Sequence, residues 1–238
     1  MKKTNIVKKL RKSCSVVATV GGRTPCKTSL AAKRHGADII ELRLDDIFRH
    51  ARSMETVAGL AGKIRSTTRL PIIATVRSAD EGGADRRLKD SKRLEIFEAV
   101  LGFVDLIDIE LDSSINRQVT AMARKKKTPV IMSWHNFRST PGASALLAIA
   151  KKALHKKADI VKIAAMAGGL EDTRRLLLFS KSWKKCPIAV IAMGEPGSIS
   201  RIAGFRFNSC LTYGYVDKPF GPGQLSVKEL SVCSGIEL

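Results

Sequence analysis

Pro71-Ile72-Ile73-Ala74-Thr75-Val76 carries apolar side chains at both odd and even positions. Successive side chains of a β-strand point to opposite faces, so this pattern predicts a strand that is buried on both faces. Such strands are typical of a parallel sheet that is covered by helices on one face and packed on itself on the other. Similar runs recur along the chain, and together they make eight predicted strands: Ser15–Val20, Ile39–Leu44, Ile72–Val76, Leu106–Glu110, Val130–Trp134, Ile160–Ile163, Ile188–Met193 and Ser209–Tyr213.

Segments of helical composition separate these strands: Lys27–His35, Ser53–Arg65, Lys89–Phe103, Ile115–Ala123, Ala143–Lys156, Leu170–Ser182 and a shorter one at Ser198–Gly204. The α/β alternation and the length of 238 residues predict a single-domain (β/α)8 TIM barrel over residues 1–238. A doubly wound open sheet is the structural alternative. That fold favours a glycine-rich phosphate loop after its first strand, and Gly21-Gly22-Arg23-Thr24-Pro25 does not have the required glycine spacing.

The chain is strongly basic, with 42 Lys plus Arg against 22 Asp plus Glu and a formal charge of +20. Such an excess attracts polyanions and raises nucleic-acid binding as a rival function. The basic residues form scattered clusters, including a basic N-terminal segment at 1–12 and groups at 124–127, 151–157 and 184–185. Aromatic residues make up 5% of the chain and none lies among those clusters, so the stacking surface of a single-strand binder is missing. Nucleic acid is therefore not the partner that we expect.

The five cysteines are an odd number without C-x-x-C spacing, so neither a disulfide framework nor a zinc site is indicated, and free thiols suit a reducing compartment. The apolar stretch after the basic N-terminus is too short for a signal-peptide core, and no run is long enough to span a membrane. We expect a cytoplasmic protein without membrane attachment or metal.

Charged side chains interrupt the predicted strands near their carboxyl ends, where the active site of a barrel lies. The alternation of a strand places Glu41 and Arg43 on one face, pointing into the barrel together. Glu41 and Arg43 could instead form a structural ion pair with each other. The other interruptions are Arg77 with Glu81 after the third strand, His135 after the fifth, Lys162 within the sixth and Arg201 after the seventh.

Lys162 is the most informative of these residues, because Ile160, Val161, Ile163 and Ala164 surround it in the sequence. A lysine in such a run must either extend to water or be desolvated, and desolvation favours the neutral amine, which is a nucleophile toward carbonyls. Several cations around one cavity indicate an anionic substrate, and an amine near an imidazole indicates imine chemistry with proton transfer. This reasoning leaves a Schiff-base lyase and a class I aldolase-type barrel open.

At these same residues the chain resembles the type I 3-dehydroquinate dehydratases. The resemblance extends from about Ser15 to Gln224. The matching stretches, in order, are Ile40–Asp45, Thr75–Ser78 with Glu81–Gly83, Ser133–Phe137 with Thr140–Pro141, Val161–Ala164, Met193–Gly194 with Ser200–Gly204, and Pro222–Gln224.

The resemblance implies a lyase of the shikimate pathway, and hence of chorismate and aromatic amino acid biosynthesis, that converts 3-dehydroquinate to 3-dehydroshikimate and water. It implies no metal or organic cofactor, and a homodimer. Lys162 would form the Schiff base, His135 would act as general acid and base, and Glu81 would orient His135. If the chain were an aldolase instead, the Gly194–Ser198 loop would bind the phosphate of its substrate.

The resemblance also implies a set of substrate-binding residues. Arg201 would pair with the substrate carboxylate, while Glu41, Arg43 and Arg77 would bind ring hydroxyls and organise the cavity. Gln224 would close over the substrate from a lid loop at 217–226, and Met193 and Tyr213 would form apolar walls. This chain departs from the family at Phe220, where a serine is common in the lid, and at Asn136, where an acidic residue is common after the histidine.

Overall fold

The computed structural model describes residues 3–234 and confirms the predicted single-domain (β/α)8 barrel. All ladder pairings are parallel, in the order β7-β6-β5-β4-β3-β2-β1-β8. An isolated bridge between Ile188 and Ser209 joins the two ends of this sheet. The strands are β1 (Ser15–Val20), β2 (Ile39–Arg43), β3 (Ile72–Thr75), β4 (Leu106–Glu110), β5 (Val130–Asn136), β6 (Ile160–Met166), β7 (Ile188–Met193) and β8 (Leu211–Tyr215).

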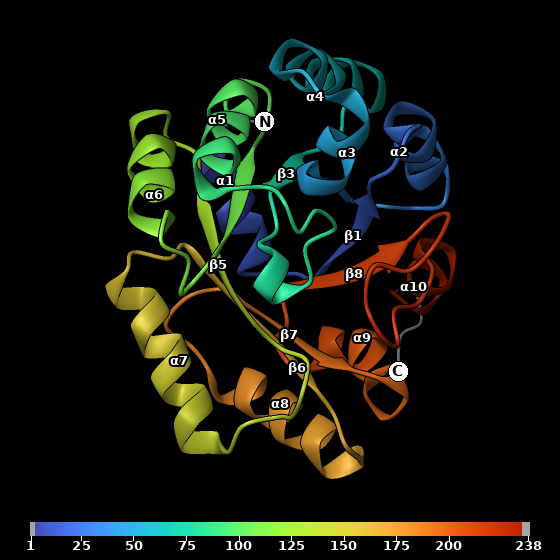
Figure 1. Ribbon diagram of the computed structural model, residues 1–238. Coiled ribbons are helices and arrows are strands. Elements are labelled where there is room, and N and C mark those ends of the chain that lie inside the picture. Colours follow the sequence, from blue (N-terminus) through green and yellow to red (C-terminus); the bar gives the residue numbers. More distant parts are fainter. Residues whose placement is uncertain (1–2, 235–238) are drawn as a thin grey trace.

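Helices form a ring around the strands (Figure 1). The α-helices are α1 (Lys3–Leu10), α2 (Pro25–Arg34), α3 (Leu44–Ala51), α4 (Met54–Thr68), α5 (Asp90–Val100), α6 (Asn116–Lys125), α7 (Ala143–His155), α8 (Leu170–Ser182), α9 (Ser200–Ala203) and α10 (Val227–Ser234). Three short 3-10 helices are η1 (Ala79–Glu81), η2 (Glu195–Gly197) and η3 (Gly204–Arg206). Some helices differ from the sequence-based expectation. Helix α3 follows β2 directly, and the helix predicted at Ser198–Gly204 is a single turn between η2 and η3.

Helix α1 accounts for most of the basic N-terminal segment, for which the sequence analysis gave only its charge. Its apolar side chains Ile6 and Leu10 are 1% and 2% exposed. They pack in one cluster with residues at the beginnings of several strands, such as Ile39, Leu106 and Ile160. The helix therefore closes the end of the barrel at which the strands begin. We call this end, with the last turns of the outer helices and the loops that follow them, the basal face.

Three aspartates fix the beginnings of the strands at the basal face. Asp38 accepts a hydrogen bond from the backbone N–H of Val16, Asp105 from that of Ile72 and Asp159 from that of Val130, at 2.8–3.0 Å. Each aspartate directly precedes one strand and binds the backbone at the start of a neighbouring strand. These contacts set the register between neighbours, because the first N–H groups of a strand need an acceptor.

The opposite end of the barrel is formed by the carboxyl ends of the strands. Strands β5 and β6 extend farther there than predicted, as far as Asn136 and Met166, and pair along the whole overlap. His135 thereby belongs to a regular strand that is held next to β6. Within residues 3–234, no helix is long and apolar enough to cross a membrane, and all five cysteines are free.

Candidate active site

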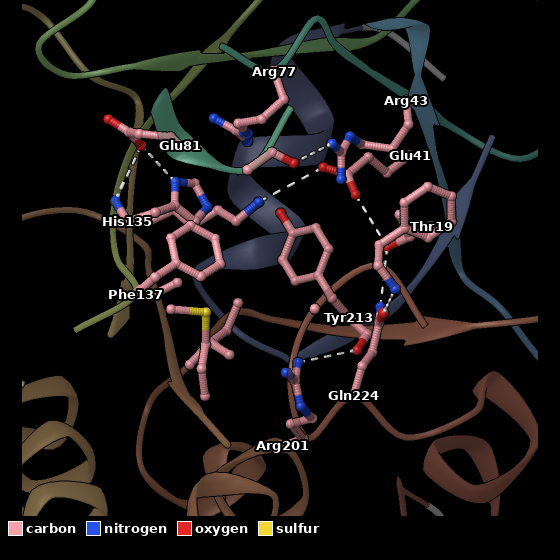
Figure 2. A pocket seen from close by; sticks show the side chains of 17 residues that line it. Thr19, Glu41, Arg43, Arg77, Glu81, His135, Phe137, Arg201, Tyr213 and Gln224 are labelled. Atoms are coloured by element: carbon pink, nitrogen blue, oxygen red, sulfur yellow. Dashed lines mark hydrogen bonds and ion pairs between the residues drawn. The ribbon is translucent and has the colours of Figure 1, made fainter. Parts of the chain in front are cut away.

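A pocket opens at the carboxyl end of the strands, and it brings together every site residue named from the sequence (Figure 2). Its space is about 550 Å³ including the open mouth. The lining residues are Thr19, Glu41, Arg43, Arg77, Glu81, Gly82, His135, Phe137, Lys162, Ala164, Ile191, Met193, Arg201, Tyr213, Phe220, Gly221 and Gln224. Strands far apart in sequence contribute to one cavity because parallel strands present their carboxyl ends on the same side.

Lys162 lies at the bottom of this pocket with 4% of its surface exposed. Its Nζ donates to Asp108 Oδ2 at 2.9 Å and lies 3.6 Å from Glu41 Oε1. Its apolar sequence neighbours Val161 and Ile163 belong to the cluster between the strands and the helices. The alternation of the strand thus separates the lysine from its own neighbours, so the amine meets carboxylates rather than the apolar surroundings that the sequence suggested.

The acidic residues of β4 were missed in the sequence analysis. Asp108 and Glu110 are 1% and 2% exposed, and both accept hydrogen bonds from Arg77. Burial alone would raise the pKa of the Asp108 carboxyl, but Arg77 and Lys162 hold it well below its usual range. The alternation in Leu106-Ile107-Asp108-Ile109-Glu110 could have found both acids, because it places them on the interior face.

Arg77 binds the carboxylates of both Asp108 and Glu110. Its Nη2 lies 2.8 Å from Asp108 Oδ1, and its Nη1 donates to Glu110 at 3.1 Å and to Ser133 Oγ at 2.8 Å. The pKa of Arg77 is raised, because the attraction of these carboxylates outweighs the cost of burying the guanidinium. This side chain can organise the cavity, but most of its donors are already in use.

Glu41 and Arg43 both point into the barrel, and each has other partners. Glu41 accepts from Thr19 at 3.1 Å and from Thr75 at 2.9 Å. Arg43 binds the carboxylate of Asp45 through Nε and Nη2 at 3.1 and 2.9 Å. The structural Glu41–Arg43 pair that the sequence left open does not occur among the salt bridges of residues 3–234.

His135 and Glu81 form the closest acid–base pair in the pocket. The ring Nδ1 of His135 lies 2.7 Å from Glu81 Oε2, and the backbone N–H of His135 donates to the same oxygen at 3.1 Å. Burial, together with the cations Arg77 and Lys162, holds the pKa of His135 well below its usual range. Burial raises the pKa of Glu81 to about 8. The imidazole is therefore neutral near pH 7, and one proton lies in the hydrogen bond between its Nδ1 and Glu81 Oε2.

Arg201 is buried without an acidic partner. Among residues 3–234, its guanidinium donates only to main-chain oxygens: Gly223 at 2.8 Å, Pro222 at 3.2 Å and Tyr213 at 3.3 Å. Burial lowers its pKa to about 10, so the group is still a cation at neutral pH. A buried cation whose charge is not neutralised favours an anion in the adjoining pocket.

The loop after β8 lines one side of the pocket with Phe220, Gly221 and Gln224, and Arg201 donates to its backbone. Gln224 donates to Thr19 Oγ1 at 3.3 Å and accepts from the backbone N–H of Phe220 at 2.7 Å. Gly223 has φ of +67°, and a Cβ there would lie 2.2 Å from the carbonyl oxygen of Gly194. This approach requires glycine. The Phe220 ring lies 5.2 Å from the Arg43 guanidinium carbon.

Apolar side chains line the rest of the pocket, and Figure 2 shows Tyr213 and Phe137 projecting into it. Phe137 stacks beside His135 with ring centroids 6.5 Å apart. Met193 lies in the wall with Ile191, as expected for an apolar residue. Tyr213 is 4% exposed, and its hydroxyl makes no hydrogen bond within residues 3–234. Thr19, Phe137 and Ile191 were not named as site residues from the sequence. Phe137 lies in a stretch that matches the family and Thr19 lies near the end of β1, whereas nothing distinguishes Ile191 from the rest of its apolar strand.

Within the part of the chain that the structure describes, no group of three or more His, Cys, Asp and Glu side chains could hold a metal ion. The pocket instead combines a buried amine, a neutral imidazole next to a carboxyl group, and an arginine free of carboxylates. These groups suit covalent attack on a carbonyl, proton transfer at a neighbouring carbon and binding of an anionic group.

Comparison with known proteins places this geometry in one family. Residues 21–233 match the family described as type I 3-dehydroquinase. A 3-dehydroquinate dehydratase from Hydrogenobaculum sp. is 38% identical over 199 residues, covering 83% of this chain and 88% of that protein. These matches favour a dehydratase over the aldolase alternative.

Solved structures support the same family assignment. A 3-dehydroquinate dehydratase from Geobacillus kaustophilus has a TM-score of 0.87 at 28% identity, with 94% of this chain and 90% of that chain covered. A type I 3-dehydroquinate dehydratase from Clostridium difficile, solved with covalent modified comenic acid, has a TM-score of 0.84 at 29% identity, with 93% and 91% covered.

Proposed function

The chain belongs to the type I 3-dehydroquinase family, and from this premise we propose that it dehydrates 3-dehydroquinate to 3-dehydroshikimate through a Schiff base on Lys162. The observation that carries the proposal is the position of Lys162, a buried amine that faces a pocket containing a neutral imidazole and a buried arginine without a carboxylate partner. Dehydratase activity follows from the family, and the roles of the individual residues are the proposal.

Lys162 starts the reaction. Its amine gives up a proton to solvent and attacks the ring ketone carbon. The carbinolamine oxygen then takes up a proton and leaves as water, which gives an iminium. Asp108 at 2.9 Å and Glu41 at 3.6 Å hold the amine in position and stabilise the cationic iminium by their negative charge. Because the iminium withdraws electrons, the hydrogen on the adjacent ring carbon becomes acidic.

His135 moves the protons. Its neutral ring accepts the proton from the adjacent carbon, and an enamine forms. The enamine electrons then expel the ring hydroxyl, which leaves as water with a proton from His135. Attack of water on the iminium releases the product and restores the Lys162 amine. Glu81 orients the ring through Nδ1 at 2.7 Å, so that the other nitrogen faces the substrate.

Arg201 binds the substrate carboxylate. Its planar guanidinium can present two N–H groups to a carboxylate. Its donors now reach Gly223 and Pro222, so substrate binding exchanges main-chain oxygens for an anion and couples the carboxylate to the loop at 217–226. We propose that this loop is the lid, with Gln224 closing over the ring and Arg43 and Glu41 contacting the ring hydroxyls.

Trapping with borohydride tests the mechanism. Reduction of the iminium during turnover of 3-dehydroquinate should leave a stable adduct on Lys162, found by intact mass and peptide mapping. His135→Ala should still be trapped while turning over very slowly, because it forms the imine and lacks the proton carrier. Lys162→Ala is the matched control and should gain no mass. Active wild-type protein whose mass is unchanged after borohydride would refute the Schiff base.

The homodimer implied by the resemblance and the cytoplasmic location expected from the sequence are part of the same proposal. Sedimentation velocity at micromolar concentration should give the mass of two chains, and a single-chain mass at the highest soluble concentration would exclude the dimer. Membrane and soluble fractions of expressing cells, probed for the protein, test its location.

A further inference from the structure

The basic clusters are scattered along the sequence, but the fold collects most of them at the basal face. Every outer helix of a (β/α)8 barrel runs back from the site end, so the last turns of the helices all lie at the opposite end. Helix α2 ends in Lys33 and Arg34, and α6 ends in Arg124 and Lys125. The polar surface of α1 adds its cations at the same place, because its apolar side closes the barrel there.

Most of these cations are exposed and unpaired. Lys8, Arg11 and Lys12 at α1 are exposed and take no part in the salt bridges of residues 3–234. The same holds for Lys125 and Lys126 at the end of α6. It also holds for Lys184 and Lys185 between α8 and β7, for Lys33 and Arg34, and for Arg206.

Acidic side chains at the basal face are few. Asp38, Asp105 and Asp159 each accept a strand N–H and lie within 4.0 Å of one cation, and Glu98 lies in the last turn of α5. Most of the other carboxylates lie at the site end or along the helices. The positive charge of the protein is therefore concentrated on the face opposite the pocket.

Residues that follow the ends of the outer helices add further cations to the basal face. Arg69, Lys127 and Lys157 follow the ends of α4, α6 and α7 with φ of 57°, 53° and 67°. This left-handed conformation is adopted by glycine without strain and is unfavourable for residues with long side chains. The attraction of cations to helix carboxyl ends explains basic residues within the last turns. Four basic residues of the described chain adopt the left-handed conformation. Three of them lie at the basal face, and the fourth, Arg52, follows α3 nearer the site end.

Contrary to the expectation from the scattered clusters in the sequence, we propose that the basal face binds the phosphate backbone of a double-stranded nucleic acid without reading its sequence. Nucleic-acid interfaces are polar and strongly positive, whereas protein interfaces have an apolar or aromatic centre and are depleted in lysine. Among the exposed large apolar side chains, Phe103 and Val232 lie toward basal ends of their elements, and no cluster of them is present there within residues 3–234. Within residues 3–234 this face therefore has no apolar centre or membrane-inserting wedge, and its aromatic side chains, such as Phe103 and Phe207, are few, whereas a single strand needs a row of stacked aromatics.

Fluorescence anisotropy with a labelled DNA duplex of about two helical turns tests this proposal over about 50–200 mM salt. The basal variant Lys125→Gln/Lys126→Gln/Lys184→Gln/Lys185→Gln should bind at least about tenfold more weakly at the lowest salt. Its slope of log affinity against log salt should be smaller by about 3–4, because each phosphate contact contributes about 0.9. The matched control Lys27→Gln/Arg86→Gln/Lys89→Gln/Arg117→Gln removes four exposed cations nearer the site end and should bind within about twofold of wild type.

An equal loss of duplex affinity in both variants would show that net charge alone attracts the duplex, and would overturn the proposal. So would a wild-type protein that leaves the duplex unbound at the lowest salt, or one that prefers vesicles containing anionic lipid over the duplex. Dehydratase turnover by the basal variant verifies that it is folded. If that variant does not fold, the double variant Lys184→Gln/Lys185→Gln should still lower the salt slope by about 2.

Discussion

The Nζ of Lys162 lies 4.0 Å from the centroid of the Tyr213 ring, while the hydroxyl of that ring makes no hydrogen bond with any residue in 3–234. A cation above an aromatic ring is stabilised by it, and this applies to an iminium as well as to an ammonium. A buried hydroxyl without a partner is costly unless a ligand supplies one. Tyr213 was expected to be an apolar wall, and its hydroxyl adds a polar group next to the proposed Schiff base.

Replacing this hydroxyl tests whether the substrate contacts it. Tyr213→Phe keeps the ring above Lys162, so we expect kcat/KM to fall about fivefold, the equivalent of one neutral hydrogen bond of about 1 kcal/mol. The free enzyme should be as stable as wild type or more stable in thermal unfolding, because an unpaired polar group is removed. Tyr213→Leu loses the ring as well and should be slower still. Unchanged kinetics with raised stability in Tyr213→Phe would leave the hydroxyl without a role in the reaction.

The shared proton of His135 and Glu81 predicts the pH dependence of activity. Below about pH 8 Glu81 tends to keep its proton, because burial raises its pKa to about 8. A protonated Glu81 donates to Nδ1 and leaves the proton of neutral His135 on Nε2, where the ring cannot act as a base. Ionised Glu81 accepts from Nδ1–H and frees Nε2. We therefore expect kcat/KM to rise with pH through about 8.

Glu81→Gln provides the comparison for this profile. The amide keeps the size and a hydrogen bond to the ring but cannot titrate, so the rise assigned to Glu81 should disappear while activity falls. Profiles of kcat/KM between about pH 6 and 9.5 for both proteins separate this effect from the titration of groups that both proteins share. A rise of the same size near pH 8 in Glu81→Gln would assign it to another group.

Asp45 should be among the residues most important for stability at the site. It is fully buried, and it accepts from Arg43 and from the backbone N–H groups of Arg77 and Ala84 at 3.2 and 2.8 Å. Asp45→Asn leaves the Arg43 guanidinium buried without its counter-charge, so the free energy of unfolding in urea at neutral pH should fall by about 3 kcal/mol. Asp80→Asn changes an exposed acid and should stay within about 0.5 kcal/mol of wild type.

The difference in free energy of unfolding between wild type and Asp45→Asn should change with pH in a definite direction. Burial alone would raise the pKa of Asp45, but Arg43 and the N–H groups hold it below its usual range. An acid whose pKa is lower in the folded state stabilises the fold above its unfolded pKa, and this contribution is lost as the pH falls through the folded pKa. The difference in free energy of unfolding between wild type and Asp45→Asn should therefore be largest at neutral pH and become smaller in acid. A gap that widens in acid would contradict this assignment.

The barrel and the pocket could be predicted because strand alternation determines which way a side chain points. Glu41, Arg43 and Lys162 face the interior as their strand positions require, and each βα unit brings its strand end to the same mouth. Asp108 and Glu110 obey the same rule and were overlooked, although β4 contains both in an apolar run. Because these acids were overlooked, the surroundings of Lys162 were expected to be apolar, whereas Asp108 binds its amine.

Other features depend on contacts between distant segments and could not be inferred locally. Nothing in the sequence around Ile6 and Leu10 shows that α1 covers the strand beginnings, because that requires the closed barrel. Likewise, the main-chain partners of Arg201 come from a loop about twenty residues later, so only the folded chain shows that its charge has no carboxylate.

Phe220 holds the proposed lid against the site. Its ring lies over Arg43 at 5.2 Å, and it packs so closely on the chain after β1 that a Cβ at Gly21 would lie 2.8 Å from it. Phe220→Ser should remove a cation–π contact worth about 1 kcal/mol, so the population of open lid should rise about fivefold. Hydrogen exchange of residues 217–226 should quicken correspondingly, and the KM should rise by a similar factor. If lid opening limits product release, kcat should rise too. Phe220→Leu keeps the apolar volume but has no aromatic ring, so its exchange rate and KM should lie between those of wild type and Phe220→Ser. An exchange rate in Phe220→Ser equal to that of wild type would show that Arg201 and Gln224 alone hold the loop.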